Sequence, residues 1–145
     1  MAIPLLVVDA NILVSALLKD STTRRIFLGA KKPGLVAPEF IKEEFLEHLD
    51  EFSERLNVKK KRLEGAVNAL LKEIRLIPTQ EYKGFLPSAI KISPDKKDAP
   101  YFALALCMNC PIWSQDKALK NQKEVRVYST HGLLELLPGL IQENQ

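Results

Sequence analysis

The chain has 145 residues, a length that suits one domain with a sizeable buried core. Its 46% hydrophobic and 27% charged residues are typical of a globular protein, and no run approaches the roughly 18 apolar residues that a membrane span needs. The net charge of +3 hides basic clusters that would suit an anionic partner, although such runs are more often solvated surface. The clusters are Arg24–Arg25, Lys31–Lys32, Lys59–Arg62 and Lys96–Lys97.

The opening residues, MAIPLLVVDA, have no basic leader and no long apolar segment before a small-residue cleavage site. We therefore expect no signal peptide and a cytoplasmic protein. Cys107 and Cys110 lie near the C-terminal end of a predicted helix, where the helix dipole does not stabilise a thiolate, and there is no second cysteine pair. A redox or zinc role for these cysteines is not expected.

The first half of the chain alternates predicted strands with predicted helices. Residues 3–9 form a continuous apolar run rich in valine and leucine, which is typical of a buried strand in a parallel sheet. Helices are predicted at 10–19 and 21–32, followed by a short strand at 34–38. The clearest amphipathic helix spans 38–56, where large apolar residues recur at three- and four-residue steps.

The second half continues this alternation. Apolar spacing, caps and prolines predict a helix at 58–74, a strand at 74–78, helical turns at 79–93, a helix at 98–109, a strand at 111–114, a helical turn at 116–121, a strand at 124–129 and a helix at 130–137. Strands that alternate with helices predict an α/β fold, a sandwich with a mostly parallel central sheet. We expect a single domain over residues 1–145.

Four acidic side chains are expected to meet at one edge of this sheet. Asp9 and Asp116 each follow a predicted strand, and open parallel sheets bind ligands beyond the carboxyl ends of their strands. Asp98 stands at the start of a helix that runs back antiparallel to the strands, so its N-terminus lies at the same edge. Glu44 lies in the first half of the helix predicted at 38–56, which begins there too.

Each acid also has a structural explanation, as a helix cap or a solvated helix residue. That explanation does not account for all four falling on one edge. Carboxylates gathered in this way repel one another unless a cation neutralises them, and their hard oxygens suit Mg²⁺ or Mn²⁺. Competing motifs are absent from the sequence: there is no G-x-x-x-x-G-K-[ST] loop, and Asn11 stands where a phosphatase with an aspartate nucleophile has its second Asp.

The same stretches resemble the motifs of the PIN-domain nucleases. VVDANILVSALL is similar to their opening strand, D-x-N and helix, and PEFIKEEFLEHL to the helix of their second motif. DKKDAPYFALAL and IWSQDKAL resemble the third and fourth motifs, and the order and spacing fit across nearly the whole chain. The resemblance implies a PIN-like α/β/α sandwich and a divalent-metal nuclease whose usual substrate is RNA.

The resemblance also implies which residues form the site. The catalytic and metal-binding acids would be Asp9, Glu44, Asp98 and Asp116. Asn11 and Ser114 match the polar supporters that orient the acids or a metal-bound water. Glu43 stands beside Glu44, and we prefer Glu44 because Phe45 follows it, as in the family's acid–apolar pair. His48 is expected at the rim of the site, without a direct role in catalysis.

These assignments predict an endoribonuclease that uses one or two Mg²⁺ or Mn²⁺ ions to hydrolyse RNA phosphodiester bonds. Many small PIN proteins are VapC-type toxin ribonucleases, and membership of that subgroup would bring an antitoxin partner and a homodimer. The long middle helices could equally serve a dimer of a free-standing processing nuclease. Two other classes stay open: a PIN-like nucleic-acid-binding module with little or no catalysis, and a structural interaction domain.

Overall fold

A five-stranded parallel sheet forms the centre of the protein, in a computed structural model that describes residues 3–17 and 21–141. The strands are β1 (Leu5–Val8), β2 (Gly34–Pro38), β3 (Ile74–Ile77), β4 (Ile112–Trp113) and β5 (Val127–Tyr128). Their order in the sheet is β3-β2-β1-β4-β5, and every neighbouring pair is parallel. The predicted α/β fold with a parallel sheet is confirmed.

Strand β1 occupies the middle of the sheet. Val7 pairs with Val36 of β2 on one side, and Val8 pairs with Trp113 of β4 on the other. These side chains are almost completely buried, as expected for a strand covered by helices on both faces. The chain leaves β1 toward β2 and returns to β4 on the opposite side, so the carboxyl end of β1 is a topological switch point.

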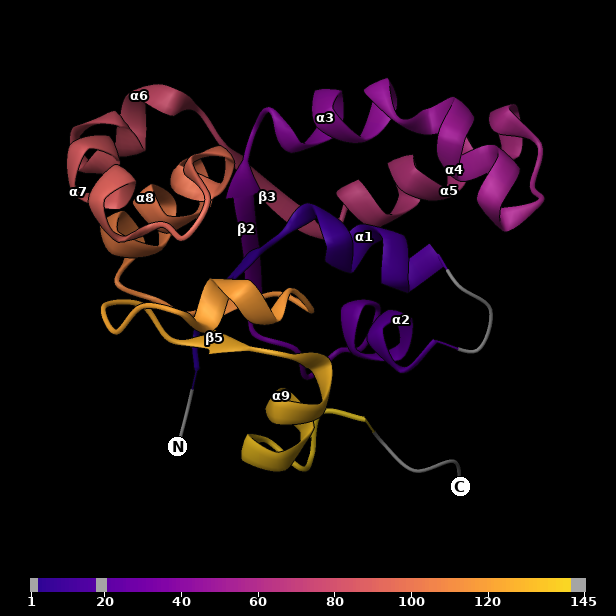
Figure 1. Ribbon diagram of the computed structural model, residues 1–145. Coiled ribbons are helices and arrows are strands. Elements are labelled where there is room, and N and C mark those ends of the chain that lie inside the picture. Colours follow the sequence, from indigo (N-terminus) through magenta and orange to yellow (C-terminus); the bar gives the residue numbers. More distant parts are fainter. Residues whose placement is uncertain (1–2, 18–20, 142–145) are drawn as a thin grey trace.

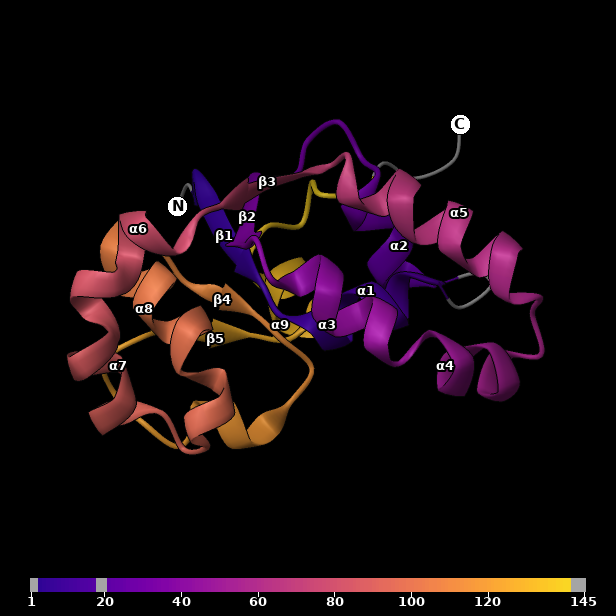
Figure 2. The same ribbon diagram turned by 90° about the horizontal axis from the view of Figure 1, so that it is seen from above.

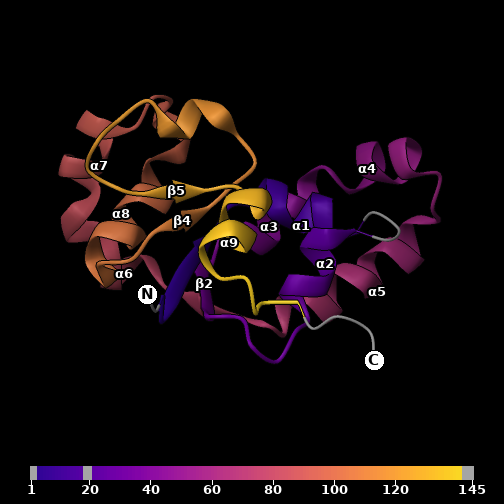
Figure 3. The ribbon, with the colours of Figure 1, turned by 90° about the horizontal axis from the view of Figure 1, so that it is seen from below.

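Helices cover both faces of the sheet (Figures 1 and 2). One face carries α1 (Ala10–Leu17), α2 (Thr22–Phe27), α3 (Ile41–Glu47), α4 (Leu49–Leu56) and α5 (Lys60–Leu71). The other face carries α6 (Thr79–Tyr82), α7 (Leu86–Ile92) and α8 (Ala99–Met108). Helix α9 (Thr130–Leu136) follows β5 and lies between that strand and α2 when the molecule is seen from below (Figure 3). Short 3₁₀ turns complete the chain: η1 (Lys83–Phe85), η2 (Lys96–Asp98) and η3 (Lys117–Lys120).

The helix predicted at 38–56 is divided in the structure, and this is a correction. Pro38 still belongs to β2, and the Glu39 N–H donates to the Ile77 carbonyl at 3.0 Å, so the helical part begins only at Ile41. At His48 the helix breaks into α3 and α4. A straight helix would separate residues 45 and 52 by about 10 Å along its axis. The break instead brings the Phe45 and Phe52 rings to 4.8 Å between centroids, and both rings pack in the same apolar cluster.

The strand predicted at 34–38 forms with those bounds, and the other predicted elements form with shorter ones. The helical turns predicted at 79–93 are α6, η1 and α7, and the helix predicted at 58–74 is the twelve-residue α5. The second predicted helix ends at Phe27, well before residue 32, and the strands predicted at 111–114 and 124–129 shrink to two residues each. The end of the helix predicted at 10–19 lies outside the described residues.

Helix α8 packs against the sheet and is largely buried. Tyr101, Phe102, Ala103, Leu104 and Ala105 are each at most 1% exposed. Despite this apolar character α8 has only ten residues, and no helix in the described part of the chain has the length and hydropathy required to cross a membrane. The burial of α8 fixes its first turn, and with it Asp98, against the carboxyl edge of β1 and β4.

Candidate active site at the carboxyl edge of the sheet

A cleft of about 530 Å³ opens where β1 and β4 end. All four predicted acids line it: Asp9, Glu44, Asp98 and Asp116. They come from four different segments, namely the residue after β1, helix α3, the end of η2 and the loop after β4. The fold therefore brings together the acids that the sequence placed at one edge.

Asp9 is buried, with 6% of its surface exposed, and its carboxylate is held by three donors. Oδ1 accepts from the Ala10 N–H at 2.7 Å. Oδ2 accepts from the Ser114 hydroxyl at 2.7 Å and from the Asn11 amide at 3.0 Å. Both predicted supporting residues thus contact the acid that opens the site, and a buried carboxylate with these donors is fixed in orientation.

Ser114 and Asn11 also tie the end of β1 to the loop after β4. The Asn11 amide donates to Ser114 Oγ at 3.2 Å, and its oxygen accepts from the Gln115 N–H at 3.1 Å. The Asp116 N–H donates to Ser114 Oγ at 3.0 Å. One serine hydroxyl therefore connects two of the four acids. Gln115 was missed by the sequence analysis, because nothing in its local sequence marks an exposed glutamine as part of a network.

Glu44 is positioned by a buried tyrosine of α8. The Tyr101 hydroxyl donates to Glu44 Oε2 at 3.0 Å, and Tyr101 itself is 1% exposed. Burial raises the pKa of the Tyr101 phenol well above its usual value, with the Glu44 charge as the next cause, so the phenol stays protonated and remains a donor. Glu43 is exposed and does not line the cleft. The geometry favours Glu44 over its neighbour.

Asp98 and Asp116 complete the acidic lining of the cleft. Asp98 precedes α8, but its side chain makes no capping hydrogen bond, so its carboxylate is left for the cleft. Asp116 is exposed, and its Oδ1 accepts from the Ala118 N–H at 3.0 Å. Asp95 accepts from the Lys97 N–H at 3.0 Å and does not line the cleft.

The charges of these acids are not balanced within the part of the chain that the structure describes. None of the observed ion pairs involves the four acids; the lysines that form ion pairs contact Glu73 and Asp50 instead. Burial raises the pKa of Asp98 to about 6, and the charges of Asp9 and Asp95 add to this effect. Burial also raises the pKa of Asp9, although the hydrogen bonds from Ser114 and Ala10 oppose the change. Such a cluster favours a bound cation.

The donor set fits a hard divalent cation, because every candidate ligand is a carboxylate oxygen. The acids nevertheless stand apart: among the described residues, no three His, Cys, Asp or Glu side chains form a ready-made metal cluster. Magnesium keeps several of its waters in protein sites, so it needs few direct carboxylate contacts. The arrangement therefore suits a hydrated ion better than a dehydrated, fully protein-ligated one.

Helix α4 supplies a part of the cleft that the sequence analysis did not identify, lined by Phe52, Arg55 and Leu56. His48, the exposed residue before α4, also lines the cleft, as expected. By contrast, the basic clusters noted in the sequence do not line the cleft within the described residues: Arg24 donates to the Ala16 and Leu17 carbonyls, and Lys32 pairs with Glu73 at 2.7 Å.

Comparison with known protein families matches residues 7–129 to the PIN domain, which is most of the chain. The chain belongs to the PIN-domain family. Members of this family are nucleases, and they generally use divalent metal ions. The resemblance drawn from the four sequence motifs is confirmed.

One solved structure has a fold similar to that of this chain. A chain in the crystal structure of VapBC2 from Rickettsia felis bound to a DNA fragment from their promoter superimposes with a TM-score of 0.64 at 16% sequence identity. The alignment covers 86% of this chain and 98% of that one. At this identity the likeness supports the fold alone. A search of curated protein sequences gives no match.

Proposed function

We propose that this PIN domain is a metal-dependent endoribonuclease that hydrolyses RNA phosphodiester bonds with Mg²⁺ or Mn²⁺. The observation that carries the proposal is one cleft lined by Asp9, Glu44, Asp98 and Asp116, without a cation paired to any of these acids among the described residues. An uncompensated carboxylate cluster of this kind is costly in a folded protein unless it binds positive charge. Because the chain belongs to a nuclease family, a metal ion bound to these acids would serve in phosphodiester hydrolysis.

In this proposal the four acids hold the metal, and Asn11 and Ser114 hold Asp9 in place. Tyr101 holds Glu44 through the hydrogen bond to Oε2. The metal would activate the attacking water and neutralise charge that develops on the phosphate. The described cleft offers no Ser-His-Asp or Cys-His arrangement as a competing machinery; its only histidine, His48, contacts Glu51 at 3.4 Å.

We further propose that the protein is a toxin of a toxin–antitoxin pair, acting as a homodimer with an antitoxin protein as partner. The support is the likeness in fold to a chain of the VapBC2 complex and the match of a single PIN unit to nearly all of that chain. A ribonuclease of this kind would meet its RNA in the cytoplasm. We treat residues 1–145 as one domain.

A second candidate is a PIN-like nucleic-acid-binding module with little or no catalysis. The observation that favours it is the spacing of the acids, since three of them do not form a ready-made metal cluster in the described residues. The two candidates differ in a single property, metal-dependent turnover.

The test is cleavage of a mixed, end-labelled RNA by the wild type and by Asp98→Asn, with Mn²⁺ and with chelator. We expect cleavage by the wild type only with metal, and a loss of about 100-fold or more in Asp98→Asn, because one ligand charge is removed. Glu124→Gln is the control: it changes an exposed acid that lies outside the cleft, and it should cleave like the wild type. Full activity of Asp98→Asn would overturn the assigned site. RNA binding without cleavage by any variant would favour the binding module.

A further inference from the structure

The cleft has two chemically different ends. The acids gather where β1 and β4 end, whereas Phe52 and Arg55 of α4, with His48 just before this helix, form a different part of the lining, here called the α4 wall. Figure 2 shows α3 between these two ends, with α8 on one side and α4 on the other. Metal chemistry accounts for the acids only, and leaves the α4 wall without a function.

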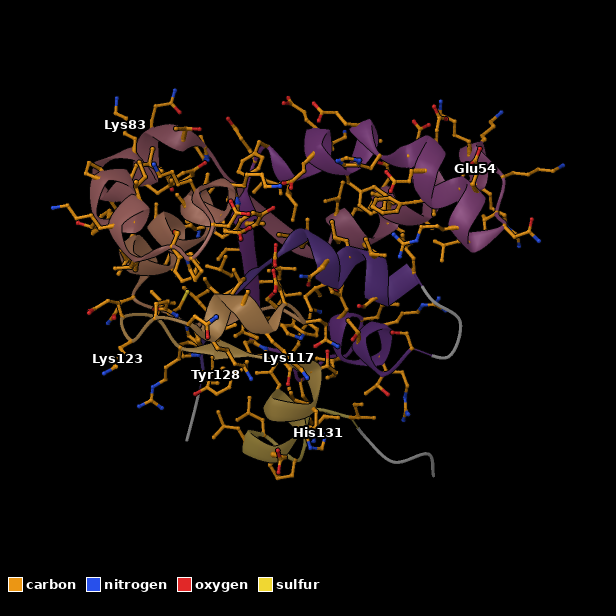
Figure 4. All side chains as sticks on the ribbon, in the orientation of Figure 1. Glu54, Lys83, Lys117, Lys123, Tyr128 and His131 are labelled. Atoms are coloured by element: carbon orange, nitrogen blue, oxygen red, sulfur yellow. The ribbon has the colours of Figure 1, made fainter. Side chains whose placement is uncertain are left out.

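Arg55 is the one arginine that lines the cleft in the part of the chain that the structure describes. Its guanidinium carbon lies 5.7 Å from the centre of the Phe52 ring, and its side chain is exposed. No ion pair in the described part of the chain involves Arg55, and Glu51 of the same helix contacts His48 at 3.4 Å. Glu54 of this helix is labelled in Figure 4. Arg55 is therefore a positive charge available to a ligand in the cleft.

Beside this charge lies an apolar and aromatic surface. The Phe52 ring is half-buried and packs at 4.8 Å from the Phe45 ring and at 6.0 Å from the His48 ring. Val14 and Leu56 continue the surface within the cleft. A ring that is fixed by its neighbours can stack on a nucleic-acid base without losing much conformational freedom.

A guanidinium beside an aromatic ring matches the two parts of an unpaired nucleotide. The guanidinium can form paired hydrogen bonds to a phosphate, and the ring offers a stacking face that any base can use. Duplex RNA does not offer a free base in this way, because its bases are stacked on each other. The α4 wall therefore fits a single-stranded segment.

We propose that the α4 wall is a nucleotide subsite for single-stranded RNA: Arg55 holds a phosphate that flanks the scissile bond, and Phe52 and His48 stack the adjoining base. The subsite rests on the proposed ribonuclease function and deepens it. Through this subsite the protein would recognise one nucleotide of the substrate in addition to the phosphate at the metal. Arg55 acts as a positioning residue, so its removal affects substrate binding more than the chemical step.

The first arm of the test removes the charge. A fluorescent single-stranded oligoribonucleotide is titrated with wild type, Arg55→Gln and Arg75→Gln, and its cleavage is followed with Mn²⁺. We expect Arg55→Gln to raise Kd and KM about tenfold and to change kcat by less than about twofold. The slope of log K against log salt should become shallower by about 0.7, the value for one phosphate contact on a single strand. Arg75 is exposed on β3, outside the cleft, so Arg75→Gln should match the wild type.

The second arm removes the stacking face. Phe52→Leu keeps an apolar side chain against Phe45 but loses the ring, and we expect a rise in Kd of about tenfold. Phe85→Leu, at an exposed aromatic residue outside the cleft, is the matched control and should bind like the wild type. Thermal unfolding of each variant verifies that a loss of binding is not a loss of fold.

Equal Kd values for Arg55→Gln and Arg75→Gln would overturn the subsite. So would an Arg55→Gln variant that needs a different Mn²⁺ concentration yet binds RNA normally, since Arg55 would then act as a counter-charge for the acids. Binding that depends on Arg55 in a wild type that never cleaves would support the subsite and overturn the proposed nuclease. A wild type that neither binds nor cleaves the oligoribonucleotide would overturn both.

Discussion

At the scale of single residues, Asp9 shows how a site acid can have a structural and a chemical role together. Its carboxylate accepts the N–H of Ala10, the first residue of α1, and it also lines the cleft with three other acids. The Ser114 and Asn11 donors hold its Oδ2 oxygen. Contact with the first residue of α1 and a place in the acidic cleft are thus compatible roles for this residue.

The two neighbouring glutamates of α3 provide a residue-scale prediction. Glu44→Gln should lower metal-dependent cleavage about 100-fold, because it removes a charge that the metal needs. Glu43→Gln makes the same change at an exposed position outside the cleft and should stay within about twofold of the wild type. The measurement is the initial rate of RNA cleavage across a Mn²⁺ titration. Inactivation by Glu43→Gln alone would show that the assignment is shifted by one residue.

At the scale of elements, a buried polar network joins α2, β4 and α9. The Thr130 hydroxyl accepts from the Trp113 indole N–H at 3.1 Å and lies 2.7 Å from the Thr23 hydroxyl. The Thr130 N–H donates to the Gln115 side chain at 2.9 Å, which links α9 to the loop that carries Asp116. These contacts explain why a C-terminal helix far from the acids in sequence supports their geometry.

This network gives a prediction for stability. Thr130→Val leaves the buried Trp113 indole N–H without its acceptor and the Thr23 hydroxyl without its partner, and we expect it to lower the free energy of unfolding by about 2–3 kcal/mol. Thr22→Val, at the exposed first residue of α2, is the matched control and should change it by less than about 0.5 kcal/mol. Urea unfolding can be followed by the fluorescence of the single tryptophan. An equal effect of both substitutions would argue against the network.

Several helix ends follow rules that are visible in the sequence, and one does not. Asn57 and Asn109 adopt the left-handed conformation just after α4 and α8, where asparagine is well tolerated. Ser129 and Ser21 cap α9 and α2. The break at His48 has no such signal, because the apolar spacing continues through it. It follows from the packing of Phe52 on Phe45, which only the folded chain reveals.

At the scale of the whole molecule, the acid cluster makes stability depend on pH and on metal. The raised pKa of Asp98, about 6, means that the folded protein binds more protons than the unfolded chain between about pH 4 and pH 6. The contribution of protonated Asp98 to the free energy of unfolding is fully present below about pH 4 and is lost as the pH rises through 6. Because Asp98 is only half-buried, we expect this contribution to the free energy of unfolding to be about 1 kcal/mol.

The corresponding measurement compares wild type and Asp98→Asn by urea unfolding in chelator from pH 4 to pH 8. Asp98→Asn should become more stable than the wild type as the pH rises, because the variant carries no charge there to repel Asp9. Addition of Mn²⁺ at pH 7 should stabilise the wild type by about 2.7 kcal/mol at one hundred times its Kd, and the variant by less. A wild type whose stability does not respond to metal would contradict the proposed site.

Resemblance to the PIN motifs supplied the two polar supporters, Asn11 and Ser114, whereas the sequence pattern by itself predicted the strand–helix alternation, the parallel sheet and the four acids at one edge. These features depend on local patterns and on a general property of parallel sheets, that strand ends meet at one edge. Only the tertiary structure decided that Tyr101 donates to Glu44, that the helix bends at His48, and that Arg55 and Phe52 face the same cleft as Asp9. Those contacts join residues that are distant in the chain or separated by an unmarked break, and their geometry arises from packing in three dimensions, which local spacing does not encode.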